Sequence, residues 1–122
     1  MKALVVDDSR AMRMMLAQIL GTCGFEIAQA RHGKDALAHL SANADTELAL
    51  IDWNMPEMNG LELVRAVRAN AAWSRIKLVM VTTENEMGHI EQALDAGADE
   101  YVMKPFSKDV IQQKLQILGV AA

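Results

Sequence analysis

The chain has 122 residues, 52% of them hydrophobic, and a formal net charge of -4 at pH 7. This length suits one hydrophobic core, so we expect residues 1–122 to form a single domain. The acidic balance disfavours a nucleic-acid surface, where Lys and Arg normally cluster. The first apolar run, residues 4–6, is too short for a signal peptide or a membrane span. We therefore expect a cytoplasmic protein that binds neither nucleic acid nor membrane.

Short runs rich in Val, Ile and Leu recur along the chain and predict five strands. They occupy residues 2–6, 25–30, 48–51, 78–81 and 101–103. A helical apolar stripe follows each run, clearest within residues 12–23 and weaker within 37–40, 63–67, 90–94 and 111–118. Near-continuous apolar strands that alternate with amphipathic helices predict a parallel sheet covered on both faces. The expected fold class is therefore α/β, a three-layer sandwich.

Local signals predict where some helices begin and end. Gly24 and Gly97 stand where helices should stop, and Ser107 can cap the start of the last helix. Arg13 and Arg68 belong to pairs of arginines on two of the predicted helices. We expect these arginines to lie on solvated helix faces.

Polar side chains stand at the end of four of the five predicted strands. They are Asp7 and Asp8, then Asp52, Thr82 and Lys104. Ligands of an open parallel sheet bind beyond the carboxyl ends of its strands. Each residue alone could be a helix cap, but carboxylates about 4 Å apart repel by about 4 kcal/mol at an effective dielectric near 20. A cation would offset that repulsion, and a few oxygen ligands suit Mg²⁺.

The arrangement resembles the receiver domains of two-component response regulators, most closely the stand-alone chemotaxis type. The matching motifs are the acidic pair Asp7 and Asp8, the segment 52–56 followed by Gly60, the pair Thr82 and Glu84, and Lys104 before Pro105 and Phe106. The resemblance covers essentially the whole chain. It implies a flavodoxin-like, doubly wound sheet of five strands in the order 2-1-3-4-5 with five helices, and a cis peptide bond before Pro105.

The resemblance also implies a role for each polar residue at the strand ends. Asp52 would accept a phosphoryl group as an aspartyl phosphate. Mg²⁺ would be held by Asp7, Asp8, Asp52 and the backbone carbonyl of Asn54. Lys104 would contact Asp52 before phosphorylation and neutralise the phosphoryl charge afterwards. Asp52 and Lys104, with Thr82, form the expected catalytic set.

Two further groups of residues have expected roles from the resemblance. Thr82 would donate a hydrogen bond to the phosphoryl group, and Tyr101 would then rotate, so that these two residues form the switch. Asn54, Thr83 and Glu84 would flank the path of the hydrolytic water and tune the lifetime of the phosphoryl group. Thr83 is larger than the residue many receivers have there, which puts the rate of phosphorylation in question.

The expected function is a phosphorylation-activated switch of a two-component system, by resemblance that of chemotaxis. A histidine kinase would supply the phosphoryl group to a monomer. The signal would pass through residues 86–96 and 99–118 to a protein target such as a flagellar motor switch protein. Apart from its own phosphotransfer and autodephosphorylation, the protein would not be an enzyme.

Three alternatives remain open at this stage. A phosphorelay intermediate would use the same site. A phosphatase of the haloacid dehalogenase type also has an Asp nucleophile with Mg²⁺, but it requires a second Asp where this chain has Asn54, an acidic pair late in the chain, and a longer chain. A small α/β binding module would leave the Asp, Thr and Lys residues each in need of a separate explanation.

Overall fold

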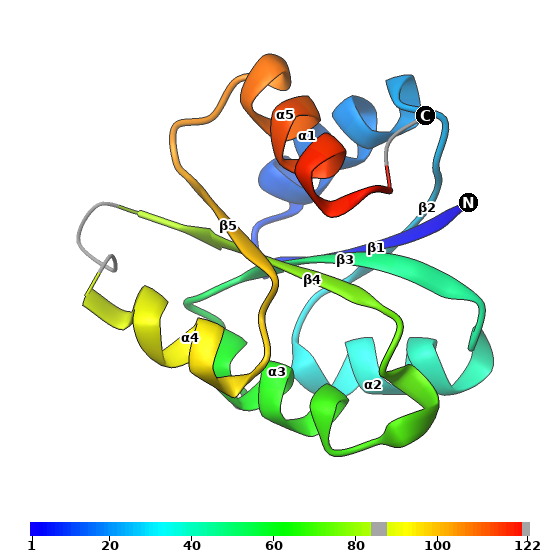
Figure 1. Ribbon diagram of the computed structural model, residues 1–122, viewed down its shortest axis with the longest axis vertical. Helices are drawn as coiled ribbons and strands as arrows, with labels where there is room; N and C mark the ends of the chain where they lie inside the picture. Colours follow the sequence, from blue (N-terminus) through cyan, green and yellow to red (C-terminus); the bar gives the residue numbers. More distant parts are fainter. Residues whose placement is uncertain (84–87, 121–122) are drawn as a thin grey trace.

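The computed structural model describes residues 1–83 and 88–120, which form a three-layer α/β sandwich (Figure 1). Strands and helices alternate in the order β1 (Lys2–Val6), α1 (Arg10–Thr22), β2 (Glu26–Ala30), α2 (Gly33–Ala42), β3 (Thr46–Asp52), α3 (Gly60–Arg68), a short 3-10 helix η1 (Ala71–Trp73), β4 (Lys77–Thr82), α4 (Ile90–Ala96), β5 (Glu100–Met103) and α5 (Lys108–Leu118). The strands are all parallel, in the order β2-β1-β3-β4-β5. The predicted fold class and strand order are confirmed.

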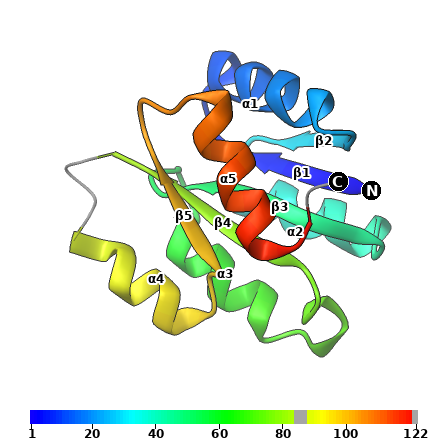
Figure 2. The ribbon, with the colours of Figure 1, turned by 45° about the horizontal axis from the view of Figure 1, so that its top comes forward.

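The helices cover both faces of the sheet. Figure 2 shows α1 and α5 on one face and α2, α3 and α4 on the other. Successive residues of β1 alternate between the two cores, as the two-residue repeat of a strand requires. Leu4 and Val6 pack with α2, α3 and α4, whereas Ala3 and Val5 pack with α1 and α5. Burial on both faces explains why the strands are continuously apolar in sequence.

Three strands, β3, β4 and β5, are longer than the sequence predicted, and the residues added at the carboxyl ends of β3 and β4 matter for the site. Asp52 is the last residue of β3 and is in register with Val81, while Thr82 ends β4 opposite Met103. The ladder continues through the Lys104 N–H, which donates to the Thr82 carbonyl at 2.6 Å. Asp52 and Thr82 are therefore held within the sheet, and a backbone hydrogen bond ties Lys104, just beyond β5, to the end of β4.

The predicted helix ends are present. The Ser107 hydroxyl accepts a hydrogen bond from the Val110 N–H, and Gly97 ends α4 with a φ of 120°. The peptide bond between Lys104 and Pro105 is cis, as the resemblance implied. Among the described helices, none is both long enough and apolar enough to cross a membrane.

Arg68 does not lie on a solvated face, so that prediction was wrong. Its guanidinium donates to the carbonyls of Gly97 at 2.9 Å and Ile76 at 2.8 Å, and pairs with Asp99 at 2.8 Å. The side chain ties the end of α3 to the start of β4 and to the turn before β5. Most of its acceptors are main-chain carbonyls, which every residue type carries, so no sequence pattern marked them.

Candidate functional site

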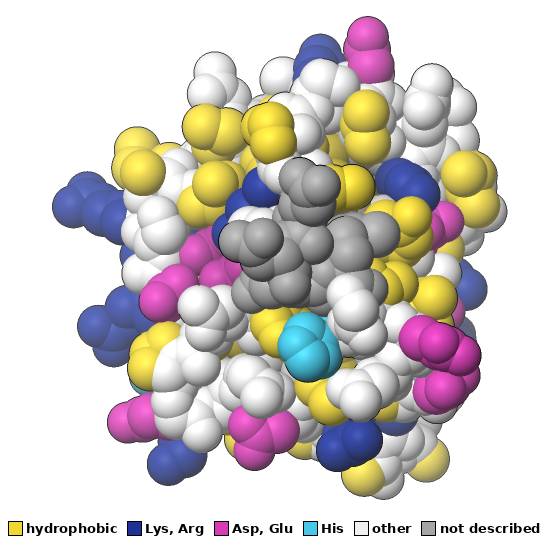
Figure 3. Space-filling model, turned by 90° about the vertical axis from the view of Figure 1, so that its left-hand side faces the viewer, with side chains coloured by type: hydrophobic (Ala, Val, Ile, Leu, Met, Phe, Trp, Pro, Cys, Tyr) yellow, Lys and Arg dark blue, Asp and Glu magenta, His cyan; other side chains and the backbone are white. Residues whose placement is uncertain are grey.

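The polar residues at the strand ends meet at the carboxyl edge of the sheet. A cavity of about 430 Å³ lies there, lined by Asp7, Asp8, Ser9, Met12, Asp52, Asn54, Thr83 and Lys104. Figure 3 looks onto this edge, where acidic side chains gather beside Lys and Arg side chains. Six of the residues singled out in the sequence are therefore brought together.

Two other predicted residues, Thr82 and Tyr101, do not line this cavity. Thr82 is fully buried at the end of β4, where its hydroxyl lies 3.3 Å from the Thr83 carbonyl. Tyr101 lies in β5, three residues before Lys104, and is half-buried. Glu84 lies outside the described residues. The structure thus separates residues that face the cavity from residues that lie behind it.

The acidic residues Asp7, Asp8 and Asp52 form a compact cluster. Each offers a carboxylate oxygen, and these three oxygens lie within 4.8 Å of one another. Asp7 is 1% exposed and Asp52 5% exposed, while Asp8 faces solvent. Two buried carboxylates and an exposed one leave a cation open to water on one side, as Mg²⁺ prefers.

One carboxylate oxygen of Asp7 is the clearest indication that this cluster can bind a cation. Its Oδ1 accepts a hydrogen bond from the Ser9 N–H at 2.8 Å. Its Oδ2 is buried and has no hydrogen-bond partner among the described residues, although the Lys104 ammonium lies 3.7 Å away. A buried carboxylate oxygen without a hydrogen bond is costly unless a cation coordinates it. The residues present therefore fit a divalent cation.

Lys104 brings a positive charge against the same cluster. Its Nζ donates to Asp52 Oδ1 at 3.1 Å, which places the ammonium against Asp52 as expected from the sequence. The lysine follows β5, so the pairing of β5 with β4 positions it. Among the described residues, one ammonium lies against these three carboxylates, so the four side chains together carry a net negative charge.

The electrostatics of the two buried carboxylates reflect that imbalance. Burial, with the negative charge of Asp7 next, raises the pKa of Asp52 from 3.8 to about 6, while Lys104 opposes the shift. Burial also raises the pKa of Asp7. Desolvation disfavours the charged form of a carboxyl group, and a nearby like charge adds to that effect. A bound cation would lower both pKa values.

The sequence interpretation missed three residues around the acidic turn. Arg13 Nη1 donates to the Asp7 carbonyl at 2.7 Å, and its Nε donates to Gln29 at 3.3 Å, so its expected place on a solvated face was wrong. Ser9 caps α1 and also binds Asp7, and Met12 lines the cavity. One signal was available: Arg13 follows Ser9 by one helical turn and must lie near the same turn of chain.

Sequence comparison assigns the family. The response regulator receiver domain matches residues 3–116. The chain belongs to the response regulator receiver family. This receiver is 44% identical over 119 residues to chemotaxis protein CheY1 of Helicobacter pylori, covering 97% of the chain and 96% of the relative. It is 43% identical over 124 residues to a CheY homolog of Campylobacter jejuni, covering 100% of the chain and 95% of the relative.

Solved structures agree with the sequence relatives. The receiver superposes on the chemotaxis protein CheY4 of Vibrio cholerae with a TM-score of 0.87 at 33% identity, covering 95% of this chain and 96% of that one. A putative response regulator from Chloroflexus aurantiacus gives a TM-score of 0.88 at 26% identity, with 97% of each chain covered. These relatives support a phosphorylation-activated signalling switch, and neither the phosphatase nor the phosphorelay alternative finds support among them.

Proposed function

We propose that this chain, as one receiver domain, accepts a phosphoryl group on Asp52 in a Mg²⁺-dependent reaction and signals by binding another protein. The observation that carries the proposal is the cluster of three carboxylates within 4.8 Å, with the Lys104 ammonium 3.1 Å from Asp52. Relatives at 43–45% identity are named chemotaxis proteins, which favours a chemotaxis system.

The transfer needs an oxygen nucleophile that faces the cavity, as Asp52 does, and positive charge around the phosphoryl group. An oxygen of Asp52 would attack phosphorus while the bond to the donor breaks and the donor group leaves with that electron pair. Asp7, Asp8, Asp52 and the Asn54 carbonyl would hold Mg²⁺. When bound, the ion supplies positive charge to the phosphoryl oxygens. Lys104, already beside Asp52, would follow the charge to the new phosphoryl group.

Thr82 and Tyr101 are proposed to convert the new charge into a change of shape. A charge-assisted hydrogen bond from the Thr82 hydroxyl would contribute about 1.5 to 3 kcal/mol. Moving an equilibrium from 1:99 to 99:1 needs about 5.5 kcal/mol, so Lys104 or the partner must supply the rest. The Lys104 N–H donates to the Thr82 carbonyl, and a movement of either residue therefore reaches the other.

The lifetime of the phosphoryl group is proposed to depend on the residues at the mouth of the cavity. Asn54 is exposed and Thr83 half-buried, and both line the cavity. They would control the approach of water to phosphorus. Glu84 is proposed for the same role and lies outside the described residues.

The proposed partners follow from the same chemistry. A histidine kinase would donate the phosphoryl group, and a protein such as a flagellar motor switch component would bind the phosphorylated form. The receiver would act as a monomer and catalyse only its own phosphorylation and dephosphorylation.

The test is phosphorylation from a small-molecule donor, acetyl phosphate, with and without Mg²⁺. We expect wild type to gain one phosphoryl group per chain, measured by phosphate-affinity electrophoresis, and to show a change in Trp53 emission with Mg²⁺ and beryllofluoride. Asp52→Asn and wild type in EDTA should do neither. Equal labelling of Asp52→Asn and wild type would refute the proposal.

A further inference from the structure

Strand β5 is short, and each of its ends is held by a different part of the molecule. It spans only Glu100–Met103 at the edge of the sheet. At its carboxyl end Lys104 reaches the acidic cluster. At its amino end Glu100 meets Lys114 of α5, with Lys114 Nζ 3.1 Å from Glu100 Oε1. One strand of four residues therefore connects the site with α5.

Tyr101 lies between these two attachments and is contacted by both members of the ion pair. Lys114 Nζ stands 4.7 Å from the centre of the Tyr101 ring, within the range of a cation-π contact. The same Glu100 oxygen that binds Lys114 also accepts the backbone N–H of Tyr101 at 3.0 Å. Two contacts thus converge on Tyr101, one on its ring and one on its backbone, and the Glu100–Lys114 ion pair links them.

The contact between Lys114 and the Tyr101 ring also joins the two layers of helices. Tyr101 packs against the core beneath α2, α3 and α4, whereas α5 belongs to the opposite face. Lys114 reaches from α5 around the edge strand to cover a ring that belongs to the other layer. A movement of the ring away from this position would lose the contact with Lys114.

We propose that Lys114 and Glu100 are positioning residues that hold Tyr101 in the arrangement seen here and so set the balance between the two shapes of the switch. The inference rests on the proposed function, because it concerns the regulation of the same site. Exposed ion pairs and cation-π contacts are each strong enough to change an equilibrium by about two- to fivefold. The side chains of Lys114 and Glu100 are 25% and 18% exposed, so each contact is partly shielded from water.

Loss of the contact should make phosphoryl binding easier. A ligand that binds only the less populated shape has an apparent affinity equal to its intrinsic affinity multiplied by the fraction of that shape. A variant that destabilises the more populated shape raises this fraction and therefore tightens apparent binding. We expect Lys114→Gln to lower the beryllofluoride concentration at half-saturation about two- to fivefold at fixed Mg²⁺, followed by Trp53 emission. Glu100→Gln should lower it about twofold. Lys114→Arg keeps the charge over the ring and should restore the wild-type value.

The matched control is Lys108→Gln, which removes one positive charge from an exposed position of the same helix. Lys108→Gln should leave the beryllofluoride concentration at half-saturation unchanged. Equal half-saturation concentrations for Lys114→Gln and Lys108→Gln would overturn the proposal. Thermal unfolding of each variant checks that the fold is intact.

A second measurement separates this proposal from the proposed function. Tyr101 is the only tyrosine of the chain, so 3-fluorotyrosine gives one ¹⁹F site. In metal-free protein, Lys114→Gln should show a second ring environment, in slow exchange or as line broadening, that Lys114→Arg and Lys108→Gln lack. Its absence would refute the positioning role even if phosphorylation proceeds. A wild-type protein that ignores beryllofluoride would refute the proposed function and leave the ¹⁹F test to decide this one.

Discussion

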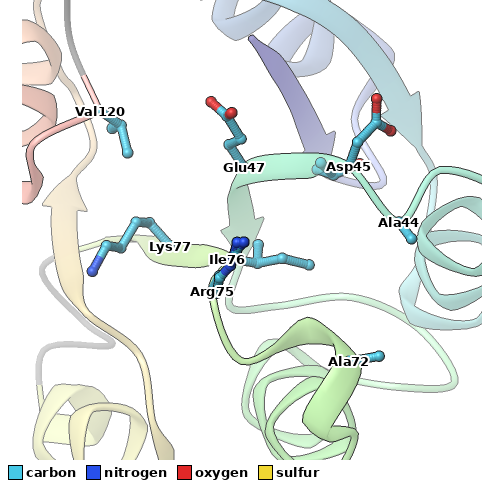
Figure 4. A pocket seen from close by; sticks show the side chains of 9 residues that line it. Ala44, Asp45, Glu47, Ala72, Arg75, Ile76, Lys77 and Val120 are labelled. Atoms are coloured by element: carbon cyan, nitrogen blue, oxygen red, sulfur yellow. The ribbon is translucent and has the colours of Figure 1, made fainter.

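The sheet has two ends, the amino edge where its parallel strands begin and the carboxyl edge where they finish. Both carry charged side chains around cavities of similar size, yet the electrostatics of the two ends differ. At the amino edge a cavity of about 500 Å³ is lined by Asp45, Glu47, Arg75 and Lys77 among others (Figure 4). The cavity at the carboxyl edge is about 430 Å³. Volume therefore does not distinguish the functional edge.

Burial of charge distinguishes it. Asp45 pairs with Lys2 at 3.1 Å in solvent, and this hydrogen bond lowers the pKa of Asp45. Asp52 also pairs with a lysine at 3.1 Å, but burial raises its pKa to about 6. The lysine lowers the carboxyl pKa in both pairs, but at Asp52 burial and the neighbouring negative charge of Asp7 outweigh it. A buried excess of negative charge is therefore what distinguishes the carboxyl edge and what fits it to hold a cation.

The largest expected difference between the edges is in phosphorylation. Asp52→Asn should abolish labelling by acetyl phosphate, a loss of more than about 100-fold, because an amide cannot replace the carboxylate nucleophile. Asp45→Asn, which removes the same charge at the other edge, should stay within about twofold of wild type. Initial rates measured by phosphate-affinity electrophoresis test this, and a loss in both variants would contradict it.

The second difference is in stability against pH. Folded Asp52, with its pKa raised from 3.8 to about 6, keeps its proton at pH values where the unfolded chain has lost it. The stabilisation from that proton is full below pH 3.8 and is lost as pH rises through about 6. The shift corresponds to about 3 kcal/mol.

Asp52→Asn removes this titration. In metal-free buffer it should be more stable than wild type by about 3 kcal/mol at pH 8, with a smaller difference at pH 5. Urea denaturation in EDTA, followed by tryptophan emission, measures the free energy of unfolding. For Asp45→Asn the difference from wild type should not grow with pH. Equal stability of Asp52→Asn and wild type at pH 8 would show that burial does not disfavour the charged form of Asp52.

Two glycines, one beside the site and one at the far end of α1, differ in how closely the backbone approaches them. A Cβ on Gly60 would lie 2.7 Å from the Asp52 carbonyl oxygen and 3.0 Å from Trp53 Cα, so Gly60→Ala must displace the backbone next to Asp52, the proposed phosphoryl acceptor. We expect a loss of about 1 to 3 kcal/mol in unfolding free energy. Gly21, near the end of α1, has nothing within 4 Å of such a Cβ, and Gly21→Ala should stabilise by about 0.5 kcal/mol.

Urea denaturation of both glycine variants at pH 7 provides the measurement. Similar changes in the two variants would mean that the close approach at Gly60 relaxes at little cost.

The smallest expected effect concerns the lysines. Lys104→Gln removes the ammonium beside Asp52 and should slow phosphorylation about tenfold, equivalent to about 1.4 kcal/mol. Lys77→Gln, at the start of β4 on the amino edge, should leave the rate unchanged. Initial rates at saturating Mg²⁺ measure this. An equal rate for Lys104→Gln and wild type would place the needed charge elsewhere.

Much of the fold and the membership of the site were predictable from the sequence. The apolar runs predicted all five strands to within two residues at each end, because strands buried on both faces must be continuously apolar. The polar residues after those runs predicted the site, because parallel strands end at one edge. The helix η1 was not predicted, since three residues carry no periodic pattern.

The sequence by itself thus determined which residues stand at the carboxyl edge and in what order. The tertiary structure alone decided their electrostatic state, because burial is a property of the packed layers. It also placed Thr82 behind the cavity, directed Arg13 and Arg68 to main-chain carbonyls, and brought Lys114 over Tyr101. The hydrogen bond from Arg68 to Gly97 joins segments 29 residues apart, and local patterns carry no information about a contact at such a separation.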